Sequence, residues 1–176
     1  VEKEGMSIIN AIRSMMHTIK GAYSTVLATK NELYMFRDPY AIRPMVFGTA
    51  EDGTVAVASE SCALDILGVK NYRELEAAEI ILVNKNGIES IKNNPNDFRT
   101  LKTDKHCIFE HIYFSRPDSF NFGSSVFSIR EKIGAALADM DNDTFDAVIP
   151  VPDSSNFIAL GYAKRKKISK NRVLLL

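Results

Sequence analysis

The residues best suited to chemistry form a polar turn between an apolar run and a helix-like segment. The run covers residues 147–149, two prolines follow, and Asp153, Ser154 and Ser155 complete the turn. Proline cannot donate to a sheet ladder, so the run is typical of a short buried strand that ends there. A helix that starts after the turn has unpaired N–H groups with a positive partial charge, which suit a phosphate. The carboxylate and hydroxyls are oxygen ligands of the kind that Mg²⁺ accepts.

A simpler interpretation of the same turn is helix capping. Asp153 and Ser154 have side chains of the type that caps a helix N-terminus without binding any ligand. Most residues of these types that precede a helix act as caps, so the local sequence leaves both interpretations open.

The composition is that of an ordinary globular protein without net charge. The 176 residues include 22 basic and 22 acidic side chains, and 45% of all residues are apolar. A balanced charge provides no field that would favour nucleic acid or a membrane surface. No apolar run approaches the length needed to cross a bilayer, so we expect neither partner. The sequence begins with Val1 rather than Met, and we expect it to be a fragment.

The two cysteines, Cys62 and Cys107, do not make a disulfide framework. So few cysteines in a chain of this size are typical of a reducing compartment, and we therefore expect a cytoplasmic protein.

Residues 1–91 are predicted to combine one amphipathic helix with antiparallel strands. Apolar residues recur at helical spacing across 6–19, and Gly21 provides a stop. The period then changes to that of strands, and the pair Asn86-Gly87 favours a tight hairpin. Strands are predicted at 22–28, 32–36, 45–47, 55–58, 79–83 and 88–91, with a short helix at 62–67. Hairpins this closely spaced indicate antiparallel sheets.

A polar segment at residues 92–106 reads as a linker, and we place a domain boundary there, between domains 1–98 and 99–176. The second domain is predicted to contain, in order, an apolar run at 107–114, a helix at 125–140 capped by Ser124 or Ser125, the strand at 147–149, a helix at 155–166 and a strand at 172–176. This alternation favours a parallel α/β sheet with its ligand site at the carboxyl ends of the strands. The predicted fold class is therefore α+β followed by α/β.

Six stretches, in order along the chain, together resemble the amidophosphoribosyltransferase family, which carries out the first committed step of purine synthesis. They are GAYSTVLAT (21–29), FRDPYAIRPMVFG (36–48), VASESCALDILG (57–68), LEAAEIILVNKNG (75–87), CIFEHIYFSRPDS (107–119) and VIPVPDSS (148–155). The resemblance implies the C-terminal part of an N-terminal-nucleophile glutaminase domain with antiparallel sheets. It also implies that the start of a type I phosphoribosyltransferase α/β domain follows.

The resemblance assigns metal and substrate roles to four residues. Ser154 matches the position that ligates Mg²⁺ in the family, and Asp153 and Ser155 lie beside it in the loop that binds the pyrophosphate of phosphoribosyl pyrophosphate (PRPP). The other family ligands, two adjacent aspartates, have no counterpart in this sequence. Cys107 matches a ligand of the 4Fe–4S cluster that some members carry, but such a cluster normally needs four thiolates. We therefore expect Cys107 to be a free thiol in this chain.

No catalytic residue of the family's glutaminase site can be assigned. Its nucleophile is an N-terminal cysteine, and Val1 is not that residue. Arg37, Asp38 and Arg43 lie in a well-matched stretch, and we interpret them as structural pairings. Residues 170–176 match either the start of the family's flexible loop or the strand before its PRPP loop.

The resemblance implies a glutamine-dependent pentosyltransferase with Mg²⁺ as its cofactor and, in some members, a 4Fe–4S cluster. Such an enzyme makes 5-phosphoribosylamine from PRPP and ammonia released from glutamine. Purine nucleotide inhibitors and a homo-oligomer are further implications of the family. We expect these 176 residues to be inactive alone. The alternative is a non-catalytic binding or scaffold descendant of the same fold.

Overall fold

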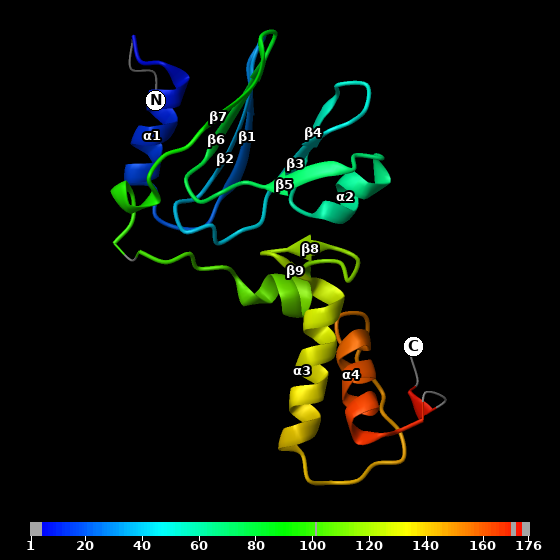
Figure 1. The fold of residues 1–176 in the computed structure, drawn as a ribbon. Helices are drawn as coiled ribbons and strands as arrows, with labels where there is room; N and C mark the ends of the chain where they lie inside the picture. The colour runs from blue at the N-terminus through cyan, green and yellow to red at the C-terminus, as the bar shows by residue number, and fades with distance from the viewer. Residues whose placement is uncertain (1–4, 101, 170–171, 174–176) are drawn as a thin grey trace. The chain divides into compact units, whose positions relative to one another are not determined.

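The computed structural model describes residues 5–100, 102–169 and 172–173, and the chain divides into two units. The first unit consists of residues 1–59 and 63–107, and the second consists of residues 60–62 and 108–176. Each unit has its own secondary structure, so each is described by itself (Figure 1).

The described part of the first unit is built mainly from short strands. Its elements in chain order are α1 (Ile8–Thr18), β1 (Ser24–Ala28), β2 (Leu33–Arg37), β3 (Val46–Thr49), β4 (Val55–Ala58), α2 (Ser61–Ile66), β5 (Asn71–Glu74), β6 (Ile80–Asn84), β7 (Gly87–Ile91) and the 3₁₀ turn η1 (Pro95–Asp97). The first two residues of α2 are counted with the second unit. The predicted helices and strands are present, and β5 is an additional strand that the sequence pattern did not indicate.

The strands form two antiparallel sheets, with the orders β1-β2-β6-β7 and β4-β3-β5. The predicted antiparallel arrangement is therefore confirmed. The hairpin between β6 and β7 pairs Asn84 with Gly87, at the Asn-Gly turn that the sequence indicated. Gly87 has a φ of 121°, a conformation that side-chain-bearing residues rarely adopt.

The two central strands of the four-stranded sheet, β2 and β6, are buried on both faces. Tyr34, Phe36, Ile80 and Leu82 point to one face, where Ile12 and Met16 of α1 cover them. The alternate residues point to the other face and pack against the three-stranded sheet, in a cluster of Met35, Ile81, Met45, Phe47 and Leu75. Alternation with a period of two is what a pleated strand imposes, and it also gives the three-stranded sheet a second covered face, where Val46 of β3 packs with Leu64 of α2 and Val69. Figure 1 shows α1 against the sheet.

The described part of the second unit is mainly helical. Its elements in chain order, after residues 60–62, are the π-helical turn η2 (Glu110–Phe114), β8 (Phe120–Asn121), β9 (Ser124–Ser125), α3 (Val126–Met140) and α4 (Asn156–Lys166). Ser125 caps α3, because its side chain accepts a hydrogen bond from the Ser128 amide at 3.3 Å. Within the described residues, no helix is long and apolar enough to cross a bilayer.

The predicted parallel sheet of the second unit is represented by one bridge. Val148 pairs in parallel with Val173, and the Val148 amide donates to the Arg172 carbonyl at 3.0 Å. Among the described residues, the expected strand at 147–149 is thus represented by one isolated bridge, at Val148. The predicted strand at 172–176, and both matches suggested for 170–176, lie largely outside the described residues. The apolar run at 107–114 ends in a helical turn.

Helices α3 and α4 lie side by side and touch through their backbones (Figure 1). Two glycines permit this approach. A Cβ atom on Gly134 would lie 1.9 Å from the Ile158 carbonyl oxygen, and one on Gly161 would lie 2.1 Å from the Glu131 carbonyl oxygen. Neither carbonyl belongs to a flexible side chain, so the helices would have to move apart to admit a methyl group.

We predict that Gly134→Ala destabilises the protein. Helix propensity alone would make this change stabilising by about 1 kcal/mol, so the sign of the effect is informative. The collision with Ile158 reverses it, and a net loss of about 1–3 kcal/mol is expected in urea unfolding. The control is Lys164→Ala on the exposed face of α4, where a change within about 0.5 kcal/mol is expected. A Gly134→Ala protein as stable as the parent would contradict the packing.

A buried carboxylate joins the two sheets of the first unit. Glu79 is 1% exposed and forms a bidentate ion pair with Arg73, at 2.5 and 2.8 Å. It also accepts hydrogen bonds from the Ser90 hydroxyl at 2.6 Å and the Glu76 amide at 2.7 Å. Burial by itself would raise the pKa of Glu79, but these hydrogen bonds outweigh it and lower the pKa below its usual value of 4.5.

We predict that Glu79 makes stability depend on pH in the acid range. A lowered pKa in the folded state means that its contribution is full above pH 4.5 and is lost as the pH falls below that value. Urea unfolding followed between neutral pH and acid should show a shallower decline in Glu79→Gln than in the parent. Glu89→Gln, an exposed change on β7, is the control and should keep the parental slope. Identical slopes in all three proteins would show that Glu79 is not responsible.

Candidate functional site

The predicted site turn lies between the Val148 bridge and the start of α4. Asp153 is exposed, and Ser154 and Ser155 are half-buried. The hydroxyl of Ser155 donates to the Val151 carbonyl, and the Asn156 amide donates to the Asp153 carbonyl at 3.2 Å. These contacts fold the turn back on itself directly before α4, so the three predicted residues stay together at the helix N-terminus.

The capping interpretation of Asp153 and Ser154 is wrong. The N-cap position of α4 is Ser155, and no side chain there accepts from the first-turn amides. The Ser155 hydroxyl makes no capping hydrogen bond and donates instead to the carbonyl of Val151. The first turn of α4 also carries no acidic residue. Among the residues that the structure describes, none provides a side-chain acceptor at the positive end of this helix, an arrangement that suits an external anion.

The turn fits a magnesium ion only together with a phosphate ligand. Its protein oxygens are the carboxylate of Asp153 and the hydroxyls of Ser154 and Ser155, and the last of these is already hydrogen-bonded. Within the described ranges, His, Cys, Asp and Glu side chains do not gather in groups of three or more that could hold a metal. Mg²⁺ in proteins commonly combines one or two side chains with substrate phosphates and waters, and that is the donor set available here.

Cys107 does not fit an iron–sulfur cluster with the residues of this chain. It is half-buried, and its amide donates to the Ile42 carbonyl at 3.1 Å. Both cysteines of the sequence are free thiols, and two thiolates are too few for a four-cysteine site.

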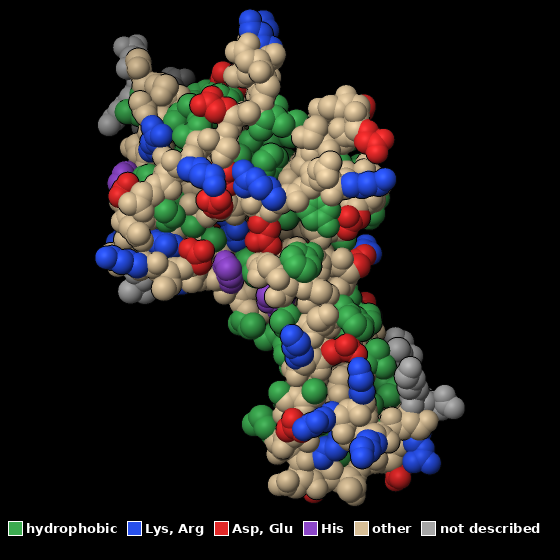
Figure 2. All heavy atoms as spheres, viewed as in Figure 1, with side chains coloured by type: hydrophobic (Ala, Val, Ile, Leu, Met, Phe, Trp, Pro, Cys, Tyr) green, Lys and Arg blue, Asp and Glu red, His purple; other side chains and the backbone are tan. Residues whose placement is uncertain are grey.

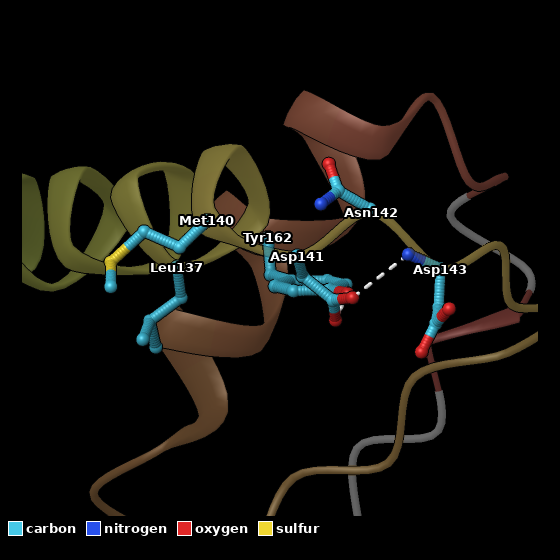
Figure 3. Close-up of a pocket in the computed structure, with 6 residues that line it drawn as sticks. All are labelled: Leu137, Met140, Asp141, Asn142, Asp143 and Tyr162. Carbon is cyan, nitrogen blue, oxygen red and sulfur yellow. Dashed lines mark hydrogen bonds between the residues drawn. The ribbon is translucent and has the colours of Figure 1, made fainter.

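A hollow of about 580 Å³ lies at the other end of the helical pair (Figure 3). Asp141, which follows α3, accepts from the Tyr162 hydroxyl at 2.7 Å and from the Asp143 amide at 3.0 Å. The hydrogen bond from Tyr162 lowers the pKa of Asp141 and raises the pKa of Tyr162 to about 12. These polar groups satisfy one another, so this hollow is a weaker candidate than the turn before α4.

Basic side chains gather at the carboxyl end of α4, and Figure 2 shows Lys and Arg side chains over the helical pair. A hollow of about 430 Å³ is lined there by Lys132, Lys164, Arg165 and Lys167, with Glu131. Arg165 is paired with Asp139 at 2.5 Å. Cations at a helix C-terminus complement its negative partial charge, which explains this cluster without a ligand.

Arg37 and Asp38 hold the chain that connects β2 and β3. The guanidinium of Arg37 donates to the carbonyls of Arg43, Leu75 and Ala41 at 2.6–2.9 Å. The Asp38 carboxylate accepts from the amides of Tyr40 and Ile42 at 2.9 and 3.0 Å. Both side chains are buried. Their charges are used mainly on backbone groups, and Arg43 takes part through its own carbonyl and amide.

A second polar cluster, in the helical unit, involves Glu60 and Ser61 at the start of α2. Glu60 accepts from the Arg116 amide and the Ser119 hydroxyl, both at 2.7 Å. The Ser61 hydroxyl accepts from the Phe120 amide at 2.8 Å. The pattern Ser59-Glu60-Ser61 is an ordinary capping sequence, so nothing local indicated that its side chains bind a turn 56–59 residues away.

The same cluster extends to α3. Arg130 is 2% exposed and donates to the carbonyls of His111 and Ser115 at 2.7 and 2.8 Å. The Ser115 hydroxyl donates to Glu110 at 2.9 Å and accepts from the Asn121 amide group at 2.7 Å. Buried polar groups of this kind are retained where they are hydrogen-bonded, and here they fix residues 110–121 against α3.

Comparisons with known proteins agree on one group of enzymes. Residues 4–65 match the family described as "Glutamine amidotransferase domain". Amidophosphoribosyltransferase 1, chloroplastic, of Arabidopsis thaliana is 42% identical over 163 residues, which cover 93% of this chain and 27% of that protein. The amidophosphoribosyltransferase of Bacillus subtilis (strain 168) is 39% identical over 153 residues, which cover 87% of this chain and 31% of that protein. This chain is a homologue of the amidophosphoribosyltransferases.

Solved structures support the homology. The B. subtilis glutamine PRPP amidotransferase complexed with ADP and GMP matches 94% of this chain and 35% of its own, with a TM-score of 0.83 and 36% identity. A structure described as the allosteric regulatory enzyme of purine biosynthesis matches with a TM-score of 0.86 and 35% identity, over 98% of this chain and 36% of its own. The chain therefore spans about a third or less of the amidophosphoribosyltransferases it matches.

We predict that Glu60→Ala loosens the turn at 116–121. The change leaves the buried Ser119 hydroxyl and the Arg116 amide without their acceptor, and an unsatisfied buried group costs about 1–3 kcal/mol. Urea unfolding measures the loss. Asp118→Ala is the matched control, because the Arg116–Asp118 ion pair is more than half exposed and such pairs contribute about 0–1 kcal/mol. If Glu60→Ala lowered the free energy of unfolding no more than Asp118→Ala does, the hydrogen bonds of Glu60 would not be needed to hold the turn.

Proposed function

We propose that these residues act within an amidophosphoribosyltransferase that makes 5-phosphoribosylamine from PRPP and glutamine-derived ammonia. The observation that carries the proposal is the 39–42% identity to enzymes of that name over 87–93% of the chain. Because the match spans less than a third of those enzymes, the activity is assigned to a polypeptide of comparable length. The glutamine amidotransferase match at 4–65 supports ammonia release from glutamine as one half of the reaction.

The proposed domain assignment is a partial glutaminase at 1–98 and a partial type I phosphoribosyltransferase at 99–176. Two antiparallel sheets in the first unit and the matched residues 4–65 support the glutaminase assignment. The parallel bridge at Val148, followed by a turn and α4, supports the transferase assignment, since parallel pairing is typical of α/β domains.

Asp153, Ser154 and Ser155 are proposed to hold the pyrophosphate group of PRPP. In the transfer, the ammonia nitrogen forms a bond to C1 of the ribose while the bond from C1 to the pyrophosphate oxygen breaks. The amides at the start of α4 are placed to bind the departing anion, and the Ser154 hydroxyl to orient it. Mg²⁺, when bound there with the phosphates, supplies positive charge that neutralises the leaving pyrophosphate.

Several partners follow from the same proposal. Purine nucleotides are proposed as inhibitors, supported by the complex of the B. subtilis amidotransferase with ADP and GMP. We also propose a homo-oligomer in a reducing, cytoplasmic compartment, and the two free cysteines are consistent with that compartment. A cluster at Cys107 is left out of the proposal, because this chain does not provide its ligands.

The function is tested on the complete gene product that contains these residues. We expect PRPP-dependent and glutamine-dependent formation of phosphoribosylamine, measured by trapping the amine and by release of pyrophosphate. A gene product that binds PRPP but turns over neither substrate would favour the non-catalytic alternative. A gene product that neither binds nor reacts would overturn the proposal.

The site is tested by Ser154→Ala and Asp153→Asn in the same protein. We predict that each weakens Mg²⁺-dependent PRPP binding, measured by calorimetry, by about tenfold or more, since hydrogen bonds to charged groups are worth about 1.5–3 kcal/mol. Ser128→Ala, an exposed serine on α3, is the control and should bind as the parent does. Unchanged PRPP binding in both site variants would show that the turn is not part of the PRPP site.

A further inference from the structure

The first turn of α3 is held by hydrogen bonds to residues outside the helix. The amides of Val126 and Phe127 donate to the carbonyls of Ser119 and Pro117, both at 3.0 Å. The turn that carries these carbonyls is itself fixed, because the Ser119 hydroxyl donates to Glu60 at 2.7 Å. The backbone of Phe127 is therefore tied to a second part of the helical unit, and the direction of its side chain starts from a fixed point.

The first turn of α4 has no comparable anchor in its own side chains. Among the described residues, no side chain caps this helix, and the Ser155 hydroxyl donates back to the Val151 carbonyl. The Ala159 amide donates to the Ser155 carbonyl at 2.8 Å, so the turn at 153–155 continues directly into the helix. Whatever orients the first turn of α4 therefore also orients the three residues of the turn.

An aromatic pair connects the two helix starts. The rings of Phe127 and Phe157 have their centroids 5.1 Å apart and are inclined at 71°, the edge-to-face arrangement that aromatic rings prefer. Phe157 lies in the first turn of α4, two residues after Ser155. The next residue, Ile158, places its carbonyl against Gly134 of α3. The glycine contact sets how closely the helices approach, and the aromatic pair is the contact nearer to the turn at 153–155.

We propose that Phe127 is a positioning residue for the pyrophosphate group of PRPP. The inference rests on the proposed function and adds to it a residue outside the turn that binds the anion. Phe127 forms no bond to PRPP. Its ring holds Phe157, and Phe157 keeps the first-turn amides of α4 and the Ser154 hydroxyl directed toward the pyrophosphate. Groups that bind a ligand lose much of their effect when the residues that support them let them move.

A ring that only packs the two helices together would have a different kinetic effect. Loss of packing reduces the amount of folded enzyme, which lowers the apparent kcat and leaves the KM for each substrate unchanged. Loss of positioning raises the KM for PRPP, because the folded enzyme itself binds the pyrophosphate less well. The KM for glutamine is the internal reference, since the proposed glutaminase residues 1–98 include neither phenylalanine of the pair.

Phe127→Leu in the complete gene product tests the proposal. Leucine keeps most of the apolar bulk but has no ring, so only the edge-to-face contact is removed. We expect the KM for PRPP to rise by about threefold to tenfold, which is what such a contact is worth, and the KM for glutamine to stay the same. Calorimetry of Mg²⁺-dependent PRPP binding should show an equal loss of affinity. An unchanged KM for PRPP, whatever happens to kcat, would overturn the proposal.

Two further variants complete the test. Phe127→Tyr keeps the ring and should bind PRPP within about twofold of the parent. Phe145→Leu is the matched control, because Phe145 is 48% exposed in the connection after α3 whereas Phe127 is 37% exposed, and it should leave the KM for PRPP unchanged. A tyrosine variant as impaired as Phe127→Leu, or an equal effect of Phe145→Leu, would contradict a role of the ring.

The parent protein separates this proposal from the one on which it rests. A parent that does not bind PRPP would overturn both the proposed function and the role of Phe127. A parent that binds and turns over PRPP, together with a Phe127→Leu protein of parental KM, would overturn the role of Phe127 alone.

Discussion

The first unit depends on two central strands, β2 and β6, that are buried on both faces. Each residue of their paired region contacts either α1 or the three-stranded sheet, as Phe36 and Met35 illustrate. Burying a large apolar side chain stabilises a fold by about 1.5–3 kcal/mol, so this double-sided strand pair contributes to two of the unit's hydrophobic clusters at once. Everything else in the unit is arranged around it. Arg37 and Asp38, at the end of β2, then hold the connection to β3 by bonds to backbone groups.

The elements that could be predicted from the sequence are those whose signal is local. The 3.6-residue period of α1, the alternation of β2 and the Asn86-Gly87 turn each act within a few residues. β5 was missed because its sequence, NYRE, has the polarity of a loop and is a strand only through its pairing with β3. The strand at 147–149 was predicted from an apolar run, yet its pairing requires a partner from elsewhere in the chain, and within the described residues that partner is Val173.

The candidate site shows the same division between local and long-range information. Asp153, Ser154 and Ser155 were predicted as neighbours because they are adjacent in sequence, and the turn keeps them together. Which of them caps α4 could not be read from residue type, because the choice depends on where the Ser155 hydroxyl points. Glu60 and Arg130 could not be predicted at all. Their partners are backbone amides and carbonyls. Because nearly every residue carries these groups, residue types do not indicate which residues hydrogen-bond to Glu60 or Arg130.

Among the described residues, the start of α4 and the outer edge of β1 both carry backbone groups that lie outside the regular helix and sheet hydrogen bonds, and geometry decides what each can accept. The Asn156 amide already donates to the Asp153 carbonyl, and the first-turn amides that follow it lie at the positive end of a helix, which suits a compact anion. The outward groups of β1 alternate donor and acceptor along a line, so an anion would meet as many carbonyls as amides. Only another extended backbone has the matching alternation. The same chemical group therefore suits a compact anion at a helix end and an extended backbone at a sheet edge.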